Sequence, residues 1–444
     1  MEKNLTTGSV LKSILYFSLP YLLSYFLQTL YGMADLFIIG QFEDISSITA
    51  VSIGSQVMHM ITVMIVGLAM GATVNIGQAI GAGNKKKAAK DIGNTVTLFM
   101  MLAIVGAAGL LFFIKPIVGM MSTPQEAVHE TVIYLTICFL GIPFITAYNI
   151  ISSIFRGIGD SKSPMYFIAV ACASNIALDY LFMGALHLGP AGAALGTTLS
   201  QLVSVIISLV VILRRKSGIH LSGADFKLER SALGEILSIG IPVMMQDGFI
   251  QVSFMIITII ANHRGLTDAA AVGIVEKIIS FLFLVPSSML STVSALGAQN
   301  IGAGKHDRVK QGFHCGMRIE AAYGVLIAVV CFSGAPFIMK LFVTDPEVVH
   351  LGVRFLRTVS LFYLMPAFTN GIQGFFRGIG DLKVTLVSST FNMVFRVAAA
   401  AVFVLVWKME IEALPYSYAV GWVVMLLYEL PMLVRYLRSH GEEL

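Results

Sequence analysis

Apolar residues run along this chain in long blocks that short polar segments separate. Each block holds roughly 20 or more residues with few charges, the length that a helix needs to cross the hydrocarbon core of a bilayer. The pattern predicts twelve membrane-spanning helices, at residues 12–40, 48–78, 92–114, 128–154, 163–184, 190–213, 234–261, 269–297, 313–338, 350–375, 384–406 and 413–436. The expected fold class is an all-α integral membrane protein.

Two sequence words occur twice. FRGIGD stands at 155–160 and 376–381, and IGAG stands at 80–83 and 301–304, so that both are displaced by 221 residues (376 − 155 and 301 − 80) in a chain of 444. This repeat predicts two pseudo-symmetric six-helix lobes, 1–221 and 222–444, with residues 214–233 as the linker between them. Because six spans return the chain to its starting side, the repeat is parallel, and a binding site between the lobes is expected.

Composition and charge agree with a membrane protein. Hydrophobic residues make up 57% of the chain and charged residues 12%, which is too apolar for a soluble protein of this length. One set of loops and both tails carry 20 of the 29 basic residues, and the opposite set carries only 4. The positive-inside rule therefore places both termini in the cytoplasm of a multi-pass protein of the inner (plasma) membrane. The net charge of +4 reflects this topology, so no nucleic-acid partner is expected.

The repeated words have a structural interpretation and a functional one. Glycine after a long apolar helix is typical of a C-terminal cap, and Arg156 and Arg377 suit anchoring at the cytoplasmic surface. A gate between the lobes is the alternative role for FRGIGD. IGAG with its following basic residues indicates a helix end and a solvated cytoplasmic loop. Neither word has the spacing of a phosphate-binding loop.

The chain carries no sign of an enzyme, a metal centre or a disulfide framework. Its nine histidines are scattered, and motifs such as HExxH and GxSxG are absent. Its four cysteines, Cys138, Cys172, Cys315 and Cys331, stand in apolar stretches without CxxC spacing. We expect no cofactor beyond a coupling ion.

Two carboxylates lie well inside the predicted spans of the first lobe. Asp35 is in the first span and Asp179 in the fifth, where Asn175 precedes it by four residues and shares its helix face. Thr197 and Thr198 add hydroxyls in the sixth span. Acids with neutral partners and no cation beside them favour binding of a proton or of Na⁺. The structural alternative is that both acids only form hydrogen bonds between helices.

The second lobe is charged differently. Asp247 and Glu276 are accompanied by basic side chains, and we expect pairing between them because an unpaired buried charge is costly. The alternative is that these groups face a cavity, so we take Asp247, Gln251, Glu276 and Lys277 as candidate substrate or ion contacts. The basic side chains are Lys277, Arg318, Arg354, Arg357 and Arg396. Pro20 and Pro242 hold equivalent places and predict points where helices bend.

These features together resemble the multidrug and toxic compound extrusion (MATE) family. The resemblance rests on twelve spans in two parallel lobes, a proline and then an aspartate in the first span, IGAG before a basic loop, and FRGIGD after the fourth and tenth spans. In the DinF-like branch, a cation site of the first lobe has counterparts here in Asp35, Asn175, Asp179 and Thr197. Another branch uses acids of the second lobe, and Asp247 and Glu276 do not match that pattern clearly.

The resemblance implies a cation-coupled antiporter that uses H⁺ or Na⁺ to export organic, often cationic, compounds. Its expected partners are small organic molecules and the lipid bilayer, and the expected state is a monomer. The main alternative is a flippase for lipid-linked precursors, which should show more cationic side chains in the first lobe. A drug transporter of another twelve-helix fold should show different loop words.

Overall fold

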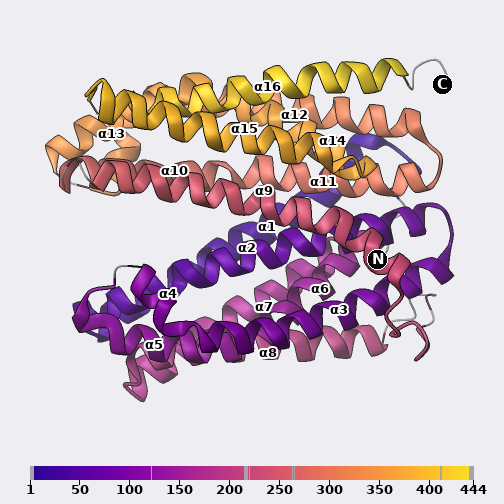
Figure 1. The fold of residues 1–444 in the computed structure, drawn as a ribbon, viewed down its shortest axis with the longest axis horizontal. Helices are drawn as coiled ribbons and strands as arrows, with labels where there is room; N and C mark the ends of the chain where they lie inside the picture. Colours follow the sequence, from indigo (N-terminus) through magenta and orange to yellow (C-terminus); the bar gives the residue numbers. More distant parts are fainter. Residues whose placement is uncertain are drawn as a thin grey trace. The chain divides into compact units, whose positions relative to one another are not determined.

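The computed structural model describes residues 5–121, 123–214, 219, 221–262, 264, 266–343, 345–410 and 413–439, in which every long element is a helix. This confirms the all-α class. The first half contains α1 (Val10–Phe42), α2 (Ile45–Gly81), α3 (Lys85–Phe112), α4 (Ile114–Met120), α5 (Gln125–Leu140), α6 (Ile142–Ile158), α7 (Lys162–Asp179), η1 (Tyr180–Ala185) and α8 (Gly189–Arg214). The second half contains α9 (Arg230–Asn262), α10 (Leu266–Leu282), α11 (Leu284–Gly302), α12 (His306–Lys340), α13 (Pro346–Phe362), α14 (Leu364–Ile379), α15 (Leu382–Ala401), η2 (Val402–Val406) and α16 (Leu414–Ser439) (Figure 1).

The number of spans agrees with the apolar pattern, with one refinement. Ten helical segments of the described chain are long and apolar enough to cross a membrane, and two bent pairs bring the total to twelve. The bends are 47° between α5 and α6 and 48° between α13 and α14. Pro143 and Pro366 each stand just after a break, where the proline ring would clash with the carbonyl of the residue four positions earlier in a straight helix.

Both halves also contain a π-helical turn at the matching place. Turn η1 follows α7 and turn η2 follows α15, with starting residues 402 − 180 = 222 positions apart. Such turns are rare and frequently accompany functional sites. The first of them begins directly after Asp179.

Contacts between Cα atoms divide the described chain into two compact units. The first unit contains Leu19–Met244, and the second contains Leu5–Ser18 and Met245–Leu444. Both changes of unit therefore fall inside a helix, close to Pro20 in α1 and to Pro242 in α9. The lobes 1–221 and 222–444 stay a prediction, as does the bending role of the two prolines.

Each unit includes the N-terminal part of a helix whose remainder belongs to the other unit. In the first unit α9 packs closely on α2, because a side chain at Gly240 would overlap the carbonyl of Leu68 and one at Gly71 would overlap that of Ile236. In the second unit the Ser288 hydroxyl on α11 donates to the Ser18 carbonyl at 2.7 Å.

The segment before α1, Leu5–Gly8, is held by two basic residues that follow the second IGAG word, Lys305 just before α12 and Arg308 in its first turn. The Arg308 guanidinium donates to the carbonyls of Leu5, Thr7 and Gly8 at 3.1, 2.8 and 2.7 Å. Lys305 donates to the Thr6 carbonyl at 2.9 Å. The helix end expected at IGAG is confirmed, and the exposed Lys305 and the half-exposed Arg308 that follow it also bind main-chain oxygens of the second unit.

The segment before α9, Asp225–Glu229, is held in the same way by α3 in the first unit. Asn94 donates to the Asp225 carbonyl at 3.2 Å and accepts from the Glu229 amide at 2.7 Å. Thr97 donates to the Phe226 carbonyl at 2.9 Å, and Lys90 forms an ion pair with Glu229. Residues 215–218 and 220 of the predicted linker lie outside the described residues.

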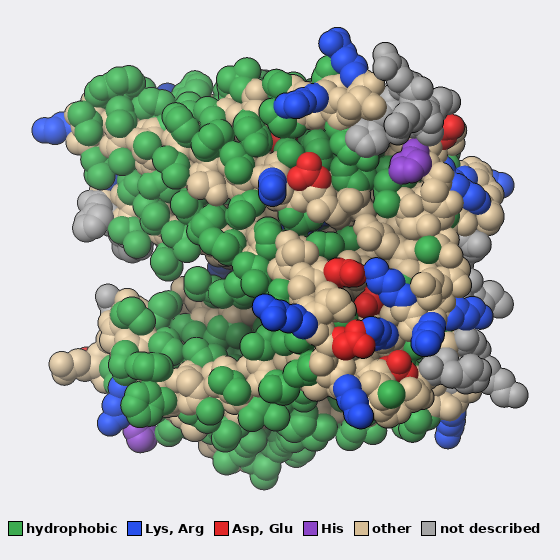
Figure 2. All heavy atoms as spheres, turned by 45° about the vertical axis from the view of Figure 1, so that its right-hand side comes forward, with side chains coloured by type: hydrophobic (Ala, Val, Ile, Leu, Met, Phe, Trp, Pro, Cys, Tyr) green, Lys and Arg blue, Asp and Glu red, His purple; other side chains and the backbone are tan. Residues whose placement is uncertain are grey.

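The repeated FRGIGD words are helix caps, as predicted. Gly159 and Gly380 have φ angles of 97° and 87°, in the left-handed region that favours glycine. Asp160 then accepts from the amides of Lys162 and Ser163 at the start of α7. Figure 2 shows hydrophobic side chains over much of the visible face, with charged side chains in smaller groups.

Candidate functional site

Asp35 lies on α1 and faces α8 inside the first unit. Its side chain is 3% exposed, and the Thr197 hydroxyl donates to its Oδ2 atom at 3.0 Å. One turn earlier on α1 the Tyr31 hydroxyl donates to the Thr197 carbonyl at 3.0 Å. These contacts align α1 with α8 so that the carboxylate and the threonine meet.

Asn175 and Asp179 lie on α7 and are fully buried, each with 0% exposure. A side chain at Gly196 on α8 would overlap Asp179 Oδ1, and its Cβ would come within 3.6 Å of Asn175 Nδ2. Asp35, Asp179 and Asn175 lie close enough to interact electrostatically, although no hydrogen bond joins them in this structure. The structure thus brings together all four residues of the predicted first-lobe site, Asp35, Asn175, Asp179 and Thr197.

Most polar atoms of this cluster have no hydrogen-bond partner. Asp35 Oδ1, both carboxylate oxygens of Asp179 and both amide atoms of Asn175 are buried and unpartnered. Two ionised carboxylates cannot bond to each other, since both are acceptors only, and their contact becomes a hydrogen bond only when they share a proton. Among the described residues no lysine or arginine forms an ion pair with either acid.

This arrangement is suited to a small positive ion. Two negative charges in a dry interior without a counter-charge are strongly destabilising, so a bound proton or cation would relieve the cluster. The carboxylates, the Asn175 carbonyl and the Thr197 hydroxyl provide oxygen ligands of the kind that hard cations prefer. In the described chain no three His, Cys, Asp or Glu side chains are grouped to hold a metal ion.

The candidate residues of the second unit do not gather into one site. Asp247 forms an ion pair with Arg377 at 2.9 Å, so it is paired as expected, but with an arginine of the FRGIGD word. Glu276 accepts from Thr258 and from Tyr418, both at 3.1 Å. Gln251 is half-buried and Lys277 is exposed.

Arg396 is enclosed by aromatic rings close to Glu276. Its guanidinium lies 3.6 Å from the ring centre of Tyr418 and 4.3 Å from that of Phe254, and its side chain is 4% exposed. Cation–π attraction and the charge of Glu276 both stabilise this buried guanidinium. The expected ion pair of Arg396 with an acid is not found among the described residues: the guanidinium lies between two rings, with Glu276 nearby but without a salt bridge.

Sequence reasoning missed two fully buried acids of the second unit. Glu320 on α12 and Glu429 on α16 both have 0% exposure. Their signal in the sequence was the same as that of Asp179, namely one carboxylate inside an apolar run.

Comparison with known proteins supplies relatives over the whole chain. The family model MatE matches residues 20–181 and 242–402. Two proteins of Bacillus subtilis (strain 168) align over most of the length. The "Probable multidrug resistance protein YoeA" is 28% identical over 94% of this chain and 92% of its own, and the "Probable multidrug resistance protein YpnP" is 30% identical over 86% and 85%. The solved structure titled "Crystal structure of MATE in the bent conformation" superposes with a TM-score of 0.92 at 22% identity, over 99% of this chain and 98% of that one.

Proposed function

Because this chain belongs to the MatE family, whose model matches both of its halves, we propose that it is a cation-coupled antiporter that exports organic, often cationic, compounds. Relatives named as multidrug resistance proteins support this class of cargo. The family consists of transporters, so the chain is not an enzyme. It is a multi-pass membrane protein, and we place both termini in the cytoplasm from the distribution of basic residues. Assignment to the DinF-like branch and a monomeric state stay predictions.

The buried acid cluster of the first unit carries the proposal. Asp35 and Asp179 lie within reach of one another without a counter-charge, and Asn175 and Thr197 complete their surroundings. A purely structural pair of acids should have hydrogen-bond donors on its oxygens, yet three of the four carboxylate oxygens have none. These oxygens without hydrogen-bond donors favour reversible binding of a cation.

Cation binding changes the net charge between α1 and α7. This change can alter how the two helices pack and therefore the conformation of the first unit. With the cation bound, the two carboxylates attract a shared positive charge and the helices can pack closely. Without it, the acids repel each other and draw in water or a cationic cargo. Since α1 changes unit next to Pro20, a shift of its outer part can take place there while residues 10–18 stay packed in the second unit. Competition between cation and cargo then gives exchange.

The first test measures ethidium or norfloxacin accumulation in cells with and without the protein. We expect lower accumulation when the protein is present, and loss of that difference when a protonophore collapses the gradient, or when Na⁺ is withdrawn if sodium is the coupling ion. Asp35→Asn should abolish gradient-driven efflux while the protein still inserts in the membrane. Glu410→Gln, at an exposed glutamate, is the matched control. Normal efflux by Asp35→Asn would contradict the assignment of the site.

The alternative of a lipid flippase is less consistent with the first unit. A cavity for anionic lipid precursors calls for cationic side chains, whereas the described part of this unit presents buried carboxylates. The buried guanidinium of the second unit, Arg396, is enclosed by rings and does not by itself change this preference.

A further inference from the structure

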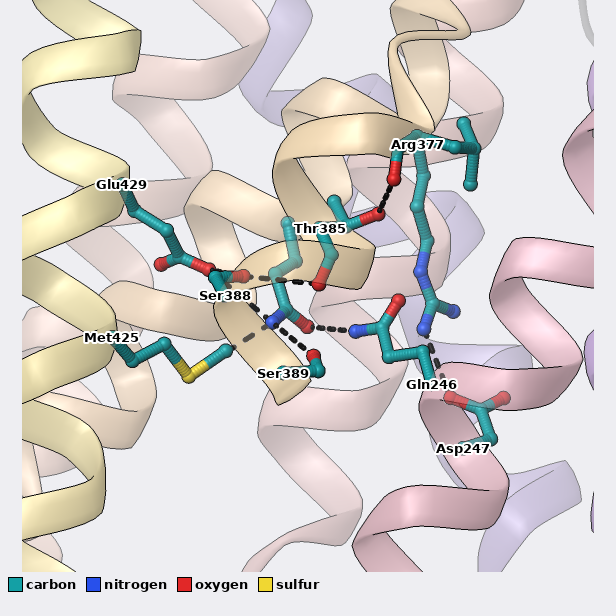
Figure 3. Close-up of polar contacts among 10 residues, drawn as sticks. Gln246, Asp247, Arg377, Thr385, Ser388, Ser389, Met425 and Glu429 are labelled. Carbon is teal, nitrogen blue, oxygen red and sulfur yellow. Dashed lines mark hydrogen bonds and ion pairs between the residues drawn. The ribbon is translucent and has the colours of Figure 1, made fainter. Parts of the chain in front are cut away.

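A second buried acid, Glu429, lies in the second unit at the centre of a network that joins four helices. It is on α16, and its side chain has 0% exposure. Its Oε1 atom is 2.7 Å from the Ser388 hydroxyl on α15 and 3.3 Å from Gln373 Nε2 on α14. Gln373 Oε1 accepts in turn from Gln246 Nε2 on α9 at 2.6 Å (Figure 3). The other carboxylate oxygen, Oε2, is buried and has no partner.

The hydroxyl of Ser388 indicates the charge state of this acid. Its oxygen lies 3.0 Å from the Thr385 carbonyl and 2.7 Å from Glu429 Oε1, yet a hydroxyl has only one hydrogen to donate. If that hydrogen goes to the Thr385 carbonyl, the short contact with Glu429 needs a hydrogen from the carboxyl group. A neutral acid satisfies both contacts, whereas an ionised one leaves one of them unmet.

Among the described residues, no basic side chain forms an ion pair that would stabilise an ionised Glu429. The salt bridges of the described residues do not include Glu429, and the one basic group in this region, Arg377, points toward Asp247 on the far side of the glutamines (Figure 3). Arg396 on α15 is engaged with Tyr418 and Phe254. Lys383 on α15 and Arg435 and Arg438 on α16 stand at the cytoplasmic ends of their helices, and Glu347, His350, Arg354 and Arg357 belong to α13.

The surroundings also do not form a cage for a metal ion. Glu429 Oε1 meets an amide nitrogen and a hydroxyl, and the Met425 sulfur lies 4.0 Å from that nitrogen. These neighbours offer one hydroxyl oxygen and one NH₂ group to Glu429 Oε1, whereas Na⁺ needs several oxygen ligands around itself.

We propose that Glu429 is a proton-binding site of the second unit, which holds a proton in this conformation and releases it during the transport cycle. The route for release runs through Gln246, which stands two residues beyond the change of unit at Met244 and Met245. A movement of α9 there would separate Gln246 from Gln373 and open the network to water. The site is separate from the coupling pair Asp35 and Asp179, so the inference goes beyond the proposed function.

Infrared difference spectra and proton counting test this proposal on the purified full-length protein. The carboxylic acid C=O band should be present at neutral pH, weaken when ethidium binds, and be reduced in Glu429→Gln. In weakly buffered detergent with a pH-indicator dye, Glu429→Gln should release about one proton fewer per ethidium than the wild type. Glu410→Gln, at an exposed acid, is the control. If Glu429→Gln does not fold, Glu429→Asp keeps an ionisable group and should shift the band rather than remove it.

The outcomes separate this site from the first one. Proton release equal to the wild type in Glu429→Gln, or an acid band that ethidium leaves unchanged, overturns the proposal. A band that Na⁺ removes at constant pH in the wild type but not in Glu429→Gln indicates a sodium site and also overturns it. If Asp35→Asn retains full coupling while Glu429→Gln releases about one proton fewer than the wild type, the proposed coupling pair is refuted and the proposal for Glu429 is supported. If Asp35→Asn loses coupling while Glu429→Gln releases as many protons as the wild type, the coupling pair is supported and the proposal for Glu429 is refuted.

Discussion

The two units place opposite charges at matching points of the same helical framework. A shift of 221 residues takes Asn175 to Arg396 and Thr197 to Tyr418 (175 + 221 and 197 + 221). A shift of 221 or 222 takes Asp179 to Ala400 or Ala401, and Asp35 to Ile256 or Ile257. The acid cluster of the first unit lies beside the π-helical turn η1, and Arg396 of the second unit lies on α15, which the turn η2 follows. Where the first unit has unpartnered acids, the second therefore has a guanidinium between aromatic rings.

This difference separates the roles that the two sites can have. The guanidinium of Arg396 is always charged, and it is held by Tyr418 and Phe254 with Glu276 nearby. The second unit thus carries a permanent cation where the first is proposed to bind a mobile one. The π-helical turns stand at matching places in the two units, while the buried side chains beside them differ in charge.

The largest effect is expected from adding one methyl group to the first site. In Gly196→Ala the new Cβ would overlap the Asp179 carboxylate, so that carboxylate must move or α7 and α8 must separate. Gradient-driven ethidium efflux should fall by about tenfold to a hundredfold, in line with the cost of small misplacements in functional sites. The control is Gly40→Ala on α1, where a Cβ would meet no atom within 4 Å. Equal efflux by both variants would mean that the spacing of α7 and α8 does not matter.

Removal of the Arg396 guanidinium should destabilise the second unit rather than change ion coupling. Arg396→Met leaves the half-buried Glu276 without its nearby positive charge, at a cost of about 3 kcal/mol. Thermal unfolding in detergent should show a lower midpoint, and the double variant Arg396→Met with Glu276→Gln should regain part of the loss. A double variant that is as unstable as the sum of both changes would show that the two groups are independent.

The basic residues after the two IGAG words offer a third comparison. Lys87 in α3 and Arg308 in α12 are also 221 residues apart (87 + 221). Arg308 donates to three carbonyls of the segment before α1, so Arg308→Ala should cost about 2 kcal/mol. Lys87 forms an ion pair with Glu235 in which both side chains are over 40% exposed, so Lys87→Ala should cost less than about 1 kcal/mol. Thermal unfolding of both variants gives the measurement, and equal losses would contradict the difference between the two loops.

The smallest effect concerns the pH dependence of the linker. Hydrogen bonds from the amide and hydroxyl of Ser222 lower the pKa of Asp225, which is partly exposed to solvent. Since the pKa is lower in the folded state, this stabilisation is present above the ordinary value of about 3.9 and is lost as the pH falls through the folded value. Corrected for the intrinsic pH dependence, amide exchange at residues 222–229 should rise in that range, and Asp225→Asn should remove the dependence.

The apolar pattern predicted the spans because each must cover the same thickness of hydrocarbon. The cluster of Asp35, Asn175, Asp179 and Thr197 was predictable because carboxylates inside apolar runs are rare. The bend at Gly141 was not expected, since Pro143 stands in an uninterrupted apolar run. Nor could the pattern show that Leu5–Ser18 packs in the second unit, because such exchange depends on contacts between residues almost 300 positions apart.

The most direct test of the account is ethidium transport in liposomes under a pH gradient or a Na⁺ gradient, each imposed alone, with the wild type and Asp179→Asn. We predict that the wild type follows one of the two gradients and that Asp179→Asn follows neither, although it still binds ethidium. Transport by Asp179→Asn at the wild-type rate under the same gradient would contradict the claim that the buried acids of the first unit hold the coupling ion.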